Sequence, residues 1–132
     1  MNLGHDCTPA MLGYAVMEGV GFGLLDALRA VQSTGADVTA CALVGGGARS
    51  VYWAQLLANI LQREIYTLHG SELSACIGAA KLGFMAIGQG AQLAVGLPVK
   101  ARYQPDPTQQ PVLQARYAKF KGLLAAARGL HD

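Results

Sequence analysis

The residues with the clearest chemical potential are three consecutive glycines, Gly45, Gly46 and Gly47, which follow an apolar run at 38–44. A strand that ends in glycines and leads into a helix leaves bare backbone N–H groups at the helix start. Glycine allows a ligand to approach closely, and the helix dipole favours an anion at that point. The pattern predicts a loop that holds a phosphate or the sugar end of a nucleotide, with a ligand-free βα turn as the alternative.

Two common nucleotide motifs fit this loop poorly. A P-loop would end in Gly-Lys followed by Ser or Thr, whereas this sequence has Ala48-Arg49-Ser50. In a dinucleotide-binding fingerprint, Ser50 stands where the third glycine is required. The acidic residue that this fingerprint places about 20 residues further on falls near Glu64. A stand-alone Rossmann-like module that binds a nucleotide or dinucleotide therefore remains an alternative.

The segments around the loop predict an α/β fold. The run at 38–44 predicts a buried strand, apolar positions from Trp53 to Leu61 recur at helical spacing, and 64–68 predicts a second strand. A strand, a helix and a strand in this order form a βαβ unit, whose two strands should be parallel. Because two strands make a poor core for apolar helices, we expect further strands upstream of residue 1 and an incomplete domain.

Three more helices are predicted around this unit. The first begins at Thr8-Pro9, and its internal glycines, each costing about 1 kcal/mol, predict that another backbone passes close to it. Another, capped by Ser71 or Ser74, extends to about residue 87 and consists of small residues that allow close packing. An extended turn at 103–107 precedes the last helix. That helix is predicted to bury one stripe, made of Leu113, Tyr117, Phe120 and Leu124.

Composition limits the classes of protein that the chain can belong to. Its 132 residues suffice for a single domain, and 52% of them are hydrophobic while only 14% are charged. So few charges predict a surface that packs against a partner or against another part of the same polypeptide. The net charge of +2 is too small for nucleic-acid binding. The uncharged stretch 82–99 contains four glycines and Pro98, so it predicts a helix end and no membrane partner.

The three cysteines predict neither a disulfide framework nor a metal site. Cys7, Cys41 and Cys76 are far apart and lie in apolar or small-residue runs. We expect them to be buried thiols in a reducing compartment, which makes the cytoplasm the expected location. No signal peptide is apparent, because Asp6 and Pro9 interrupt any apolar segment near the N-terminus.

Several blocks, in the right order and spacing, resemble the FGGY family of carbohydrate kinases. The blocks are 43–50 with Trp53, Gln55 and 57–60, then Glu72 with 78–80, and 15–22 further upstream. The first of them is similar to the nucleotide motif of the family's second domain. The likeness extends over roughly residues 3–128, and within the family the xylulose kinases are the most similar group.

The resemblance implies an actin-like (ribonuclease H-like) ATPase fold for the C-terminal part of a two-domain sugar kinase. It also implies ATP with Mg²⁺ as cofactor and a ketopentose such as D-xylulose as the acceptor of the γ-phosphoryl group. In that picture the nucleotide lies against Gly46 and Gly47, Ser50 contacts the adenine, and Arg49 beside it is either a ribose-edge contact or a surface residue. The candidate nucleotide-binding residues are thus Gly45, Gly46, Gly47, Arg49 and Ser50.

The family's phosphate loop, Asp-x-Gly-Thr, and its catalytic aspartate have no counterpart in this sequence. No catalytic residue and no metal ligand is therefore assigned, and the chain alone is expected to be inactive. The expected partner is the N-terminal sugar-binding domain of the same enzyme. A homodimer, and a non-catalytic domain that pairs with another protein, are further alternatives. In a mild departure from the family, Asn59 stands where an aspartate is usual.

Overall fold

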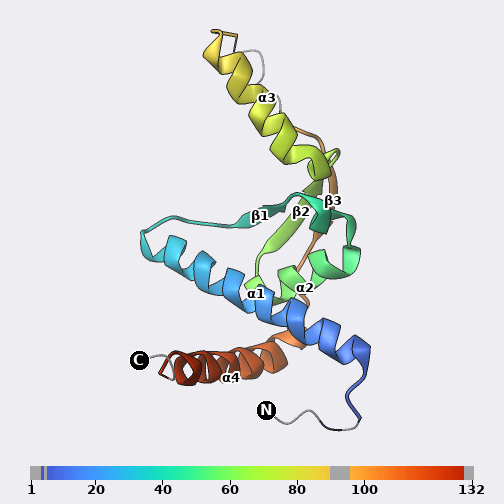
Figure 1. Ribbon diagram of the computed structural model, residues 1–132, viewed down its shortest axis with the longest axis vertical. Helices are drawn as coiled ribbons and strands as arrows, with labels where there is room; N and C mark the ends of the chain where they lie inside the picture. The colour runs from blue at the N-terminus through green and yellow to red at the C-terminus, as the bar shows by residue number, and fades with distance from the viewer. Residues whose placement is uncertain (1–3, 5, 90–95, 130–132) are drawn as a thin grey trace.

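The computed structural model describes residues 4, 6–89 and 96–129 (Figure 1). The helices and strands, with 3₁₀ helices labelled η, are α1 (Pro9–Ser33), β1 (Ala40–Leu43), η1 (Gly46–Arg49), α2 (Val51–Leu61), β2 (Glu64–Leu68), η2 (Ser71–Leu73), α3 (Ser74–Ala86), β3 (Val99–Tyr103), η4 (Pro107–Gln109) and α4 (Gln110–Arg128). Figure 1 shows α1 and α2 on one side of the sheet, α4 beyond α1, and α3 projecting from the opposite end of the molecule.

The sheet has three strands in the order β1-β2-β3. β1 and β2 are parallel, with Ala40 beside Glu64 and Leu43 beside Thr67, which confirms the predicted βαβ unit. β3 runs antiparallel to β2 and was not predicted. Three of its five residues are exposed and two are half-buried. The segment 99–103 therefore lacks the apolar run by which the other two strands could be recognised.

β1 lies at the edge of the sheet, and the prediction that it is buried is wrong. Ala42 is exposed and the other three residues of β1 are half-buried. Within the described part of the chain, the outer edge of β1 has no strand partner. An apolar groove of about 390 Å³ lies beside this edge, lined by side chains of α1, β1 and α2, including Val31 and Leu43. The apolar run is suited to burial on both faces, but the described elements cover it incompletely.

The core forms where α2 packs against the sheet, α1 and α4. Six of the eleven residues of α2 are buried. Gly21 and Phe22 are the buried residues of α1, and the Phe22 ring lies 5.5 Å from the rings of both Tyr117 and Phe120 of α4. Leu113 of α4 is buried as well, so the predicted apolar stripe of this helix is confirmed at its first three positions.

α1 is the one described helix that is long and apolar enough to cross a membrane. Packing inside the protein also accounts for its apolar composition, because Gly21 and Phe22 are buried in the core. Its polar residues are bonded to α4: Arg116 donates hydrogen bonds to the carboxylate of Glu18 at 2.9 Å and to the hydroxyl of Tyr14 at 3.3 Å. Burial, together with Glu18, raises the pKa of Tyr14 to about 12. The absence of a membrane partner stays a prediction.

A second polar cluster connects α1 and α4 on the other side of the aromatic rings. The Tyr117 hydroxyl donates a hydrogen bond to the Asp26 carboxylate, and Lys121 forms an ion pair with Asp26 at 3.3 Å. The Arg29 guanidinium lies 4.6 Å from the centre of the Tyr117 ring. The hydrogen bond from Tyr117 is the largest of the effects that lower the pKa of Asp26.

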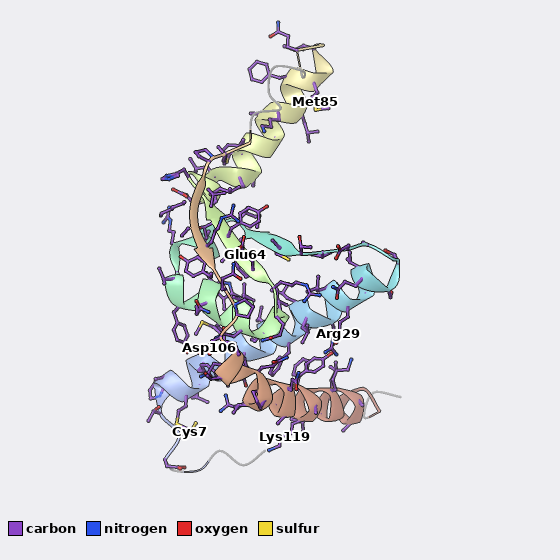
Figure 2. All side chains as sticks on the ribbon, turned by 180° about the vertical axis from the view of Figure 1, so that it is seen from behind. Cys7, Arg29, Glu64, Met85, Asp106 and Lys119 are labelled. Carbon is purple, nitrogen blue, oxygen red and sulfur yellow. The ribbon has the colours of Figure 1, made fainter. Side chains whose placement is uncertain are left out.

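Some of the predicted features of α3 are confirmed and others are wrong. α3 ends at Ala86, close to the predicted end near residue 87, while 90–95 of the uncharged stretch lie outside the described residues. None of the residues of α3 is buried, so its small residues do not pack closely against another described element. Neither Ser71 nor Ser74 caps this helix, because Leu73 occupies the N-cap position and makes no side-chain hydrogen bond. Figure 2 shows Met85 near the far end of this projecting helix.

The three thiols differ in their exposure. Cys7 and Cys41 are half-buried, whereas Cys76 is exposed on α3. None of the three is fully buried, so the prediction of buried thiols is wrong, most clearly for Cys76, because the small residues around it lie on a helix that packs against little else.

Among the glycines inside α1, Gly21 alone lies against another part of the structure. A Cβ atom added at Gly21 would lie 2.5 Å from Cδ1 of Ile60 in α2, whereas one added at Gly19 or Gly23 would meet nothing within 4 Å. The predicted close approach is thus found at one position, and the neighbour is a side chain rather than a backbone.

This difference gives a matched pair of substitutions. Gly21→Ala and Gly23→Ala should gain the same helix propensity, but only the former forces the buried Ile60 side chain to move. We expect Gly21→Ala to be less stable than Gly23→Ala by about 1–3 kcal/mol, as for other overpacked cores. Urea denaturation of the two variants measures the difference, and equal stabilities would contradict the close contact.

The Asp26 carboxylate gives a second test of the packing of α4. Because its folded-state pKa is lowered, the stabilisation it provides is present above about pH 4 and is lost as the pH falls through the folded-state value. Tyr117→Phe removes the main cause and should raise the pKa of Asp26 toward its ordinary value. NMR titration of the carboxyl carbon measures the shift. Exposed Tyr52 supplies the control, since Tyr52→Phe should leave Asp26 unchanged.

Candidate functional site

The glycine loop connects the end of β1 to the start of α2. Gly45 has φ +79° and ψ −167°, a conformation essentially restricted to glycine. Its N–H donates a hydrogen bond to the carbonyl of Ser71 at 2.8 Å, and its own carbonyl accepts one from the N–H of Ala48 at 3.1 Å. The first glycine is thus bound on both sides, which fixes the direction in which the loop leaves the sheet.

The next two glycines present their backbone to the surface. Gly46 and Gly47 are both exposed, and no described residue accepts a hydrogen bond from either N–H group. A Cβ atom added at Gly46 would meet nothing within 4 Å, while one at Gly47 would lie 3.2 Å from Cδ1 of Trp53. Trp53 is the only tryptophan of the chain. The loop therefore offers two unpaired backbone donors next to an intrinsic fluorophore.

Ser50 and Arg49 lie at the junction of the loop and α2. Ser50 is the N-cap of α2, and its Oγ accepts a hydrogen bond from the N–H of Trp53 at 3.1 Å. The hydroxyl hydrogen of Ser50 is still free to donate to a ligand. Arg49 is exposed at the end of η1. The five candidate residues form one continuous segment, and their contact with a nucleotide stays a prediction.

The segment after β2 meets the glycine loop, and this contact was not predicted from the sequence. The carboxyl ends of parallel β1 and β2 lie at the same edge of the sheet, so the residues after β2 come close to those after β1. There Gly70, with φ +71°, turns the chain into η2, and the buried Ser71 carbonyl reaches Gly45. Two features of the sequence could have indicated this contact: the predicted parallel pairing of the two strands and the glycine that follows the second one.

Glu64 lies at the other end of the sheet. The strand register places it beside Ala40, at the start of β2, whereas the loop leaves from the end of β1. Arg102 and Gln104 both donate hydrogen bonds to its carboxylate, and Figure 2 shows Glu64 on the sheet. Glu64 lines an open depression of about 740 Å³ there. The acidic group that a Rossmann-like site would need is therefore not beside the glycine loop.

Over residues 4, 6–89 and 96–129, no group of three or more His, Cys, Asp and Glu side chains is placed to hold a metal ion. The donors at the loop are backbone N–H groups and a hydroxyl, which suit an anion or a nucleotide rather than a cation.

Comparison with known proteins identifies the family. Residues 1–87 match the profile of the FGGY family of carbohydrate kinases, C-terminal domain. The chain belongs to this family. It is 34% identical over 125 residues to a xylulose kinase from Escherichia coli (strain K12), an alignment covering 92% of this chain and 26% of the relative. It is 32% identical over 129 residues to an L-xylulose/3-keto-L-gulonate kinase of the same strain, covering 94% of this chain and 26% of that protein.

Solved structures show the same relationship. The FGGY domain described here superimposes on a crystal structure of a "xyloylose kinase" from Brucella ovis with a TM-score of 0.80 and 31% sequence identity, covering 97% of this chain and 27% of that one. The predicted family is thus confirmed, together with its helix-rich α/β architecture. The chain spans about a quarter of the length of the relatives it matches.

Asn59, at the position where the resemblance to the family implies an aspartate, holds the turn before α4. Its Oδ1 accepts hydrogen bonds from Nε2 of Gln55 at 3.0 Å and from the N–H of Asp106 at 2.9 Å. Nε2 of Gln55 also donates to the carbonyl of Gln104 at 2.7 Å. An aspartate oxygen could accept the same two bonds, so the substitution preserves the contact and removes a charge.

Proposed function

We propose that this chain is the ATP-binding C-terminal part of a carbohydrate kinase that phosphorylates a ketopentose such as D-xylulose. The observation that supports it best is the pair of exposed, unpartnered amides of Gly46 and Gly47 at the start of η1, in the loop that leads to α2. Exposed backbone donors of this kind can bind anionic groups. The names of the relatives support a keto sugar as the acceptor.

In this proposal each residue of the loop has a separate task. The amides of Gly46 and Gly47 contact the nucleotide, the hydroxyl of Ser50 donates to the adenine, and Arg49 lies at the ribose edge. Gly45 sets the course of the backbone, because its N–H is already used by Ser71. Mg²⁺ would accompany ATP and neutralise phosphate charge, with its ligands outside this chain.

The N-terminal sugar-binding domain of the same enzyme is the proposed partner. The described chain has an actin-like ATPase arrangement in this proposal, and the rest of the enzyme continues the sheet at the open edge of β1. That edge carries no charged residue or proline, the usual features that protect a free strand edge. Val31 and Val44, both 49% exposed, would be covered by this contact. We place the complete enzyme in the cytoplasm, and a homodimer remains an alternative.

Nucleotide binding can be measured with the chain itself. ADP and ATP should change the fluorescence of Trp53, because its ring lies against Gly47, and both should bind more tightly than NAD. Preference for NAD would favour a dinucleotide-binding module. Failure of all three to bind would favour a non-catalytic domain that pairs with another protein.

Two matched variants test whether the nucleotide binds at the glycine loop. Gly46→Ala places a methyl group in the path of the ligand without any steric conflict in the free chain. We expect it to weaken ADP binding about tenfold, which corresponds to about 1.4 kcal/mol, with little loss of stability. Gly122→Ala in α4 also meets nothing within 4 Å and should leave ADP affinity unchanged. Equal affinities of the two variants would place the nucleotide elsewhere.

The proposal also predicts that the purified chain does not phosphorylate D-xylulose. Transfer of the γ-phosphoryl group needs a base directed at the attacking hydroxyl and charge neutralisation around the phosphates, and no candidate for the base is found in the loop. A coupled ADP-release assay measures the rate, with the Escherichia coli xylulose kinase as the positive control. Turnover by the chain alone would contradict this assignment of tasks.

A further inference from the structure

The carbonyl of Ser71 accepts hydrogen bonds from two different parts of the chain. The N–H of Gly45 donates one at 2.8 Å, and Ser74, the first residue of α3, donates from its backbone N–H and also from Oγ, at 2.6 Å. Ser71 is only 2% exposed. Because water has little access to this residue, the loss of the bond from Gly45 or from Oγ of Ser74 would not be readily compensated by solvent.

The bond from Gly45 determines where the glycine loop begins. The backbone conformation of Gly45 is one that persists only when its surroundings hold it in place. The Ser71 carbonyl supplies that restraint on the N–H side, and the bond from Ala48 supplies it on the carbonyl side. The orientation of the next two amides, at Gly46 and Gly47, depends on this first peptide.

Ser74 is placed to hold the same carbonyl from the side of α3. It is half-buried, as are Ile77 and Gly78 further along α3, and no residue of this helix is fully buried. Its hydroxyl therefore makes a specific polar contact at the root of a helix that otherwise packs against little of the described structure.

Resting on the proposed function, we infer that Ser74 is a positioning residue for the nucleotide loop. It acts through Ser71: the hydroxyl of Ser74 adds to the bond from its own backbone N–H in orienting the carbonyl, the carbonyl holds Gly45, and Gly45 directs the two free amides toward the nucleotide. The position of α3 is thereby coupled to the geometry of the loop. A contact that shifts the start of α3 would change nucleotide affinity without touching the nucleotide.

The test compares Ser74→Ala with Ser74→Thr, which keeps the hydroxyl. A hydrogen bond of this kind contributes about 0.5–1.5 kcal/mol, so its loss corresponds to roughly a 2- to 10-fold effect. In the ligand-free chain, Ser74→Ala should accelerate hydrogen exchange at the Gly45 amide by that factor, measured by NMR. It should also weaken ADP binding to the same degree in the Trp53 titration, and Ser74→Thr should restore both values.

Ser33 provides a control with the same type of bond. Its Oγ donates to the carbonyl of Ala30 at 2.8 Å, three residues earlier, at the end of α1. Ser33→Ala should change neither Gly45 exchange nor ADP affinity. If Ser74 only stabilised the local turn, circular dichroism of Ser74→Ala would show reduced helix content while the exchange rate of Gly45 stayed the same.

The two readouts separate this inference from the proposed function. Unchanged Gly45 exchange in Ser74→Ala would overturn the positioning role, whatever the ADP affinity. If the unaltered chain failed to bind ADP, the proposed function would fail and Ser74 could have no role in nucleotide binding, while faster exchange would still establish the coupling of Ser74 to Gly45. Faster exchange with unchanged ADP affinity would show that the coupling does not reach the nucleotide.

Discussion

The close contact between α1 and α2 at Gly21 and Ile60 is the packing constraint on which the other helices depend. A methyl group at Gly21 would collide with Cδ1 of Ile60, so the buried side chain of Ile60 fills the space that this glycine leaves on α1. Phe22, the next residue, is thereby buried with its ring against those of Tyr117 and Phe120. α2 begins at Val51, directly after its N-cap Ser50 and the glycine loop, so the packing that holds α4 in place also fixes where the loop ends.

The local parts of this arrangement could be predicted because they depend on residues that are close together in the sequence. The spacing of apolar residues in α2, the Ser50 cap and the glycines before it define a strand–loop–helix segment without any tertiary information. The parallel pairing of β1 and β2 follows from the intervening helix and the handedness of such connections. All five candidate residues fall in this segment, so the sequence could place them together on one loop, while their contact with a nucleotide stays a prediction.

The parts that were not predicted depend on residues far apart in the chain. β3 is held in the sheet by pairing with β2 and by bonds such as that between Arg102 and Glu64. The sequence of β3 alone shows neither of these contacts. The exposure of β1 is a property of its place in the sheet, since an apolar run has the same composition at an edge as in the centre. Likewise, nothing in the spacing of Ser71 from Gly45 shows that a carbonyl and an amide meet.

Burial and exposure are divided sharply within the loop, and this division suits a site that is shared between two parts of an enzyme. Ser71, which holds the first glycine, is buried, so the base of the loop does not depend on a ligand for its shape. Gly46, Gly47, Arg49 and Ser50 are exposed, and so are the neighbouring apolar side chains of Val51 and Tyr52. A preformed backbone with an uncovered apolar rim can position a nucleotide but cannot exclude water from it. The low proportion of charged residues agrees with the proposed partner domain, because β1, α3 and the loop rim expose apolar side chains that such a domain could cover.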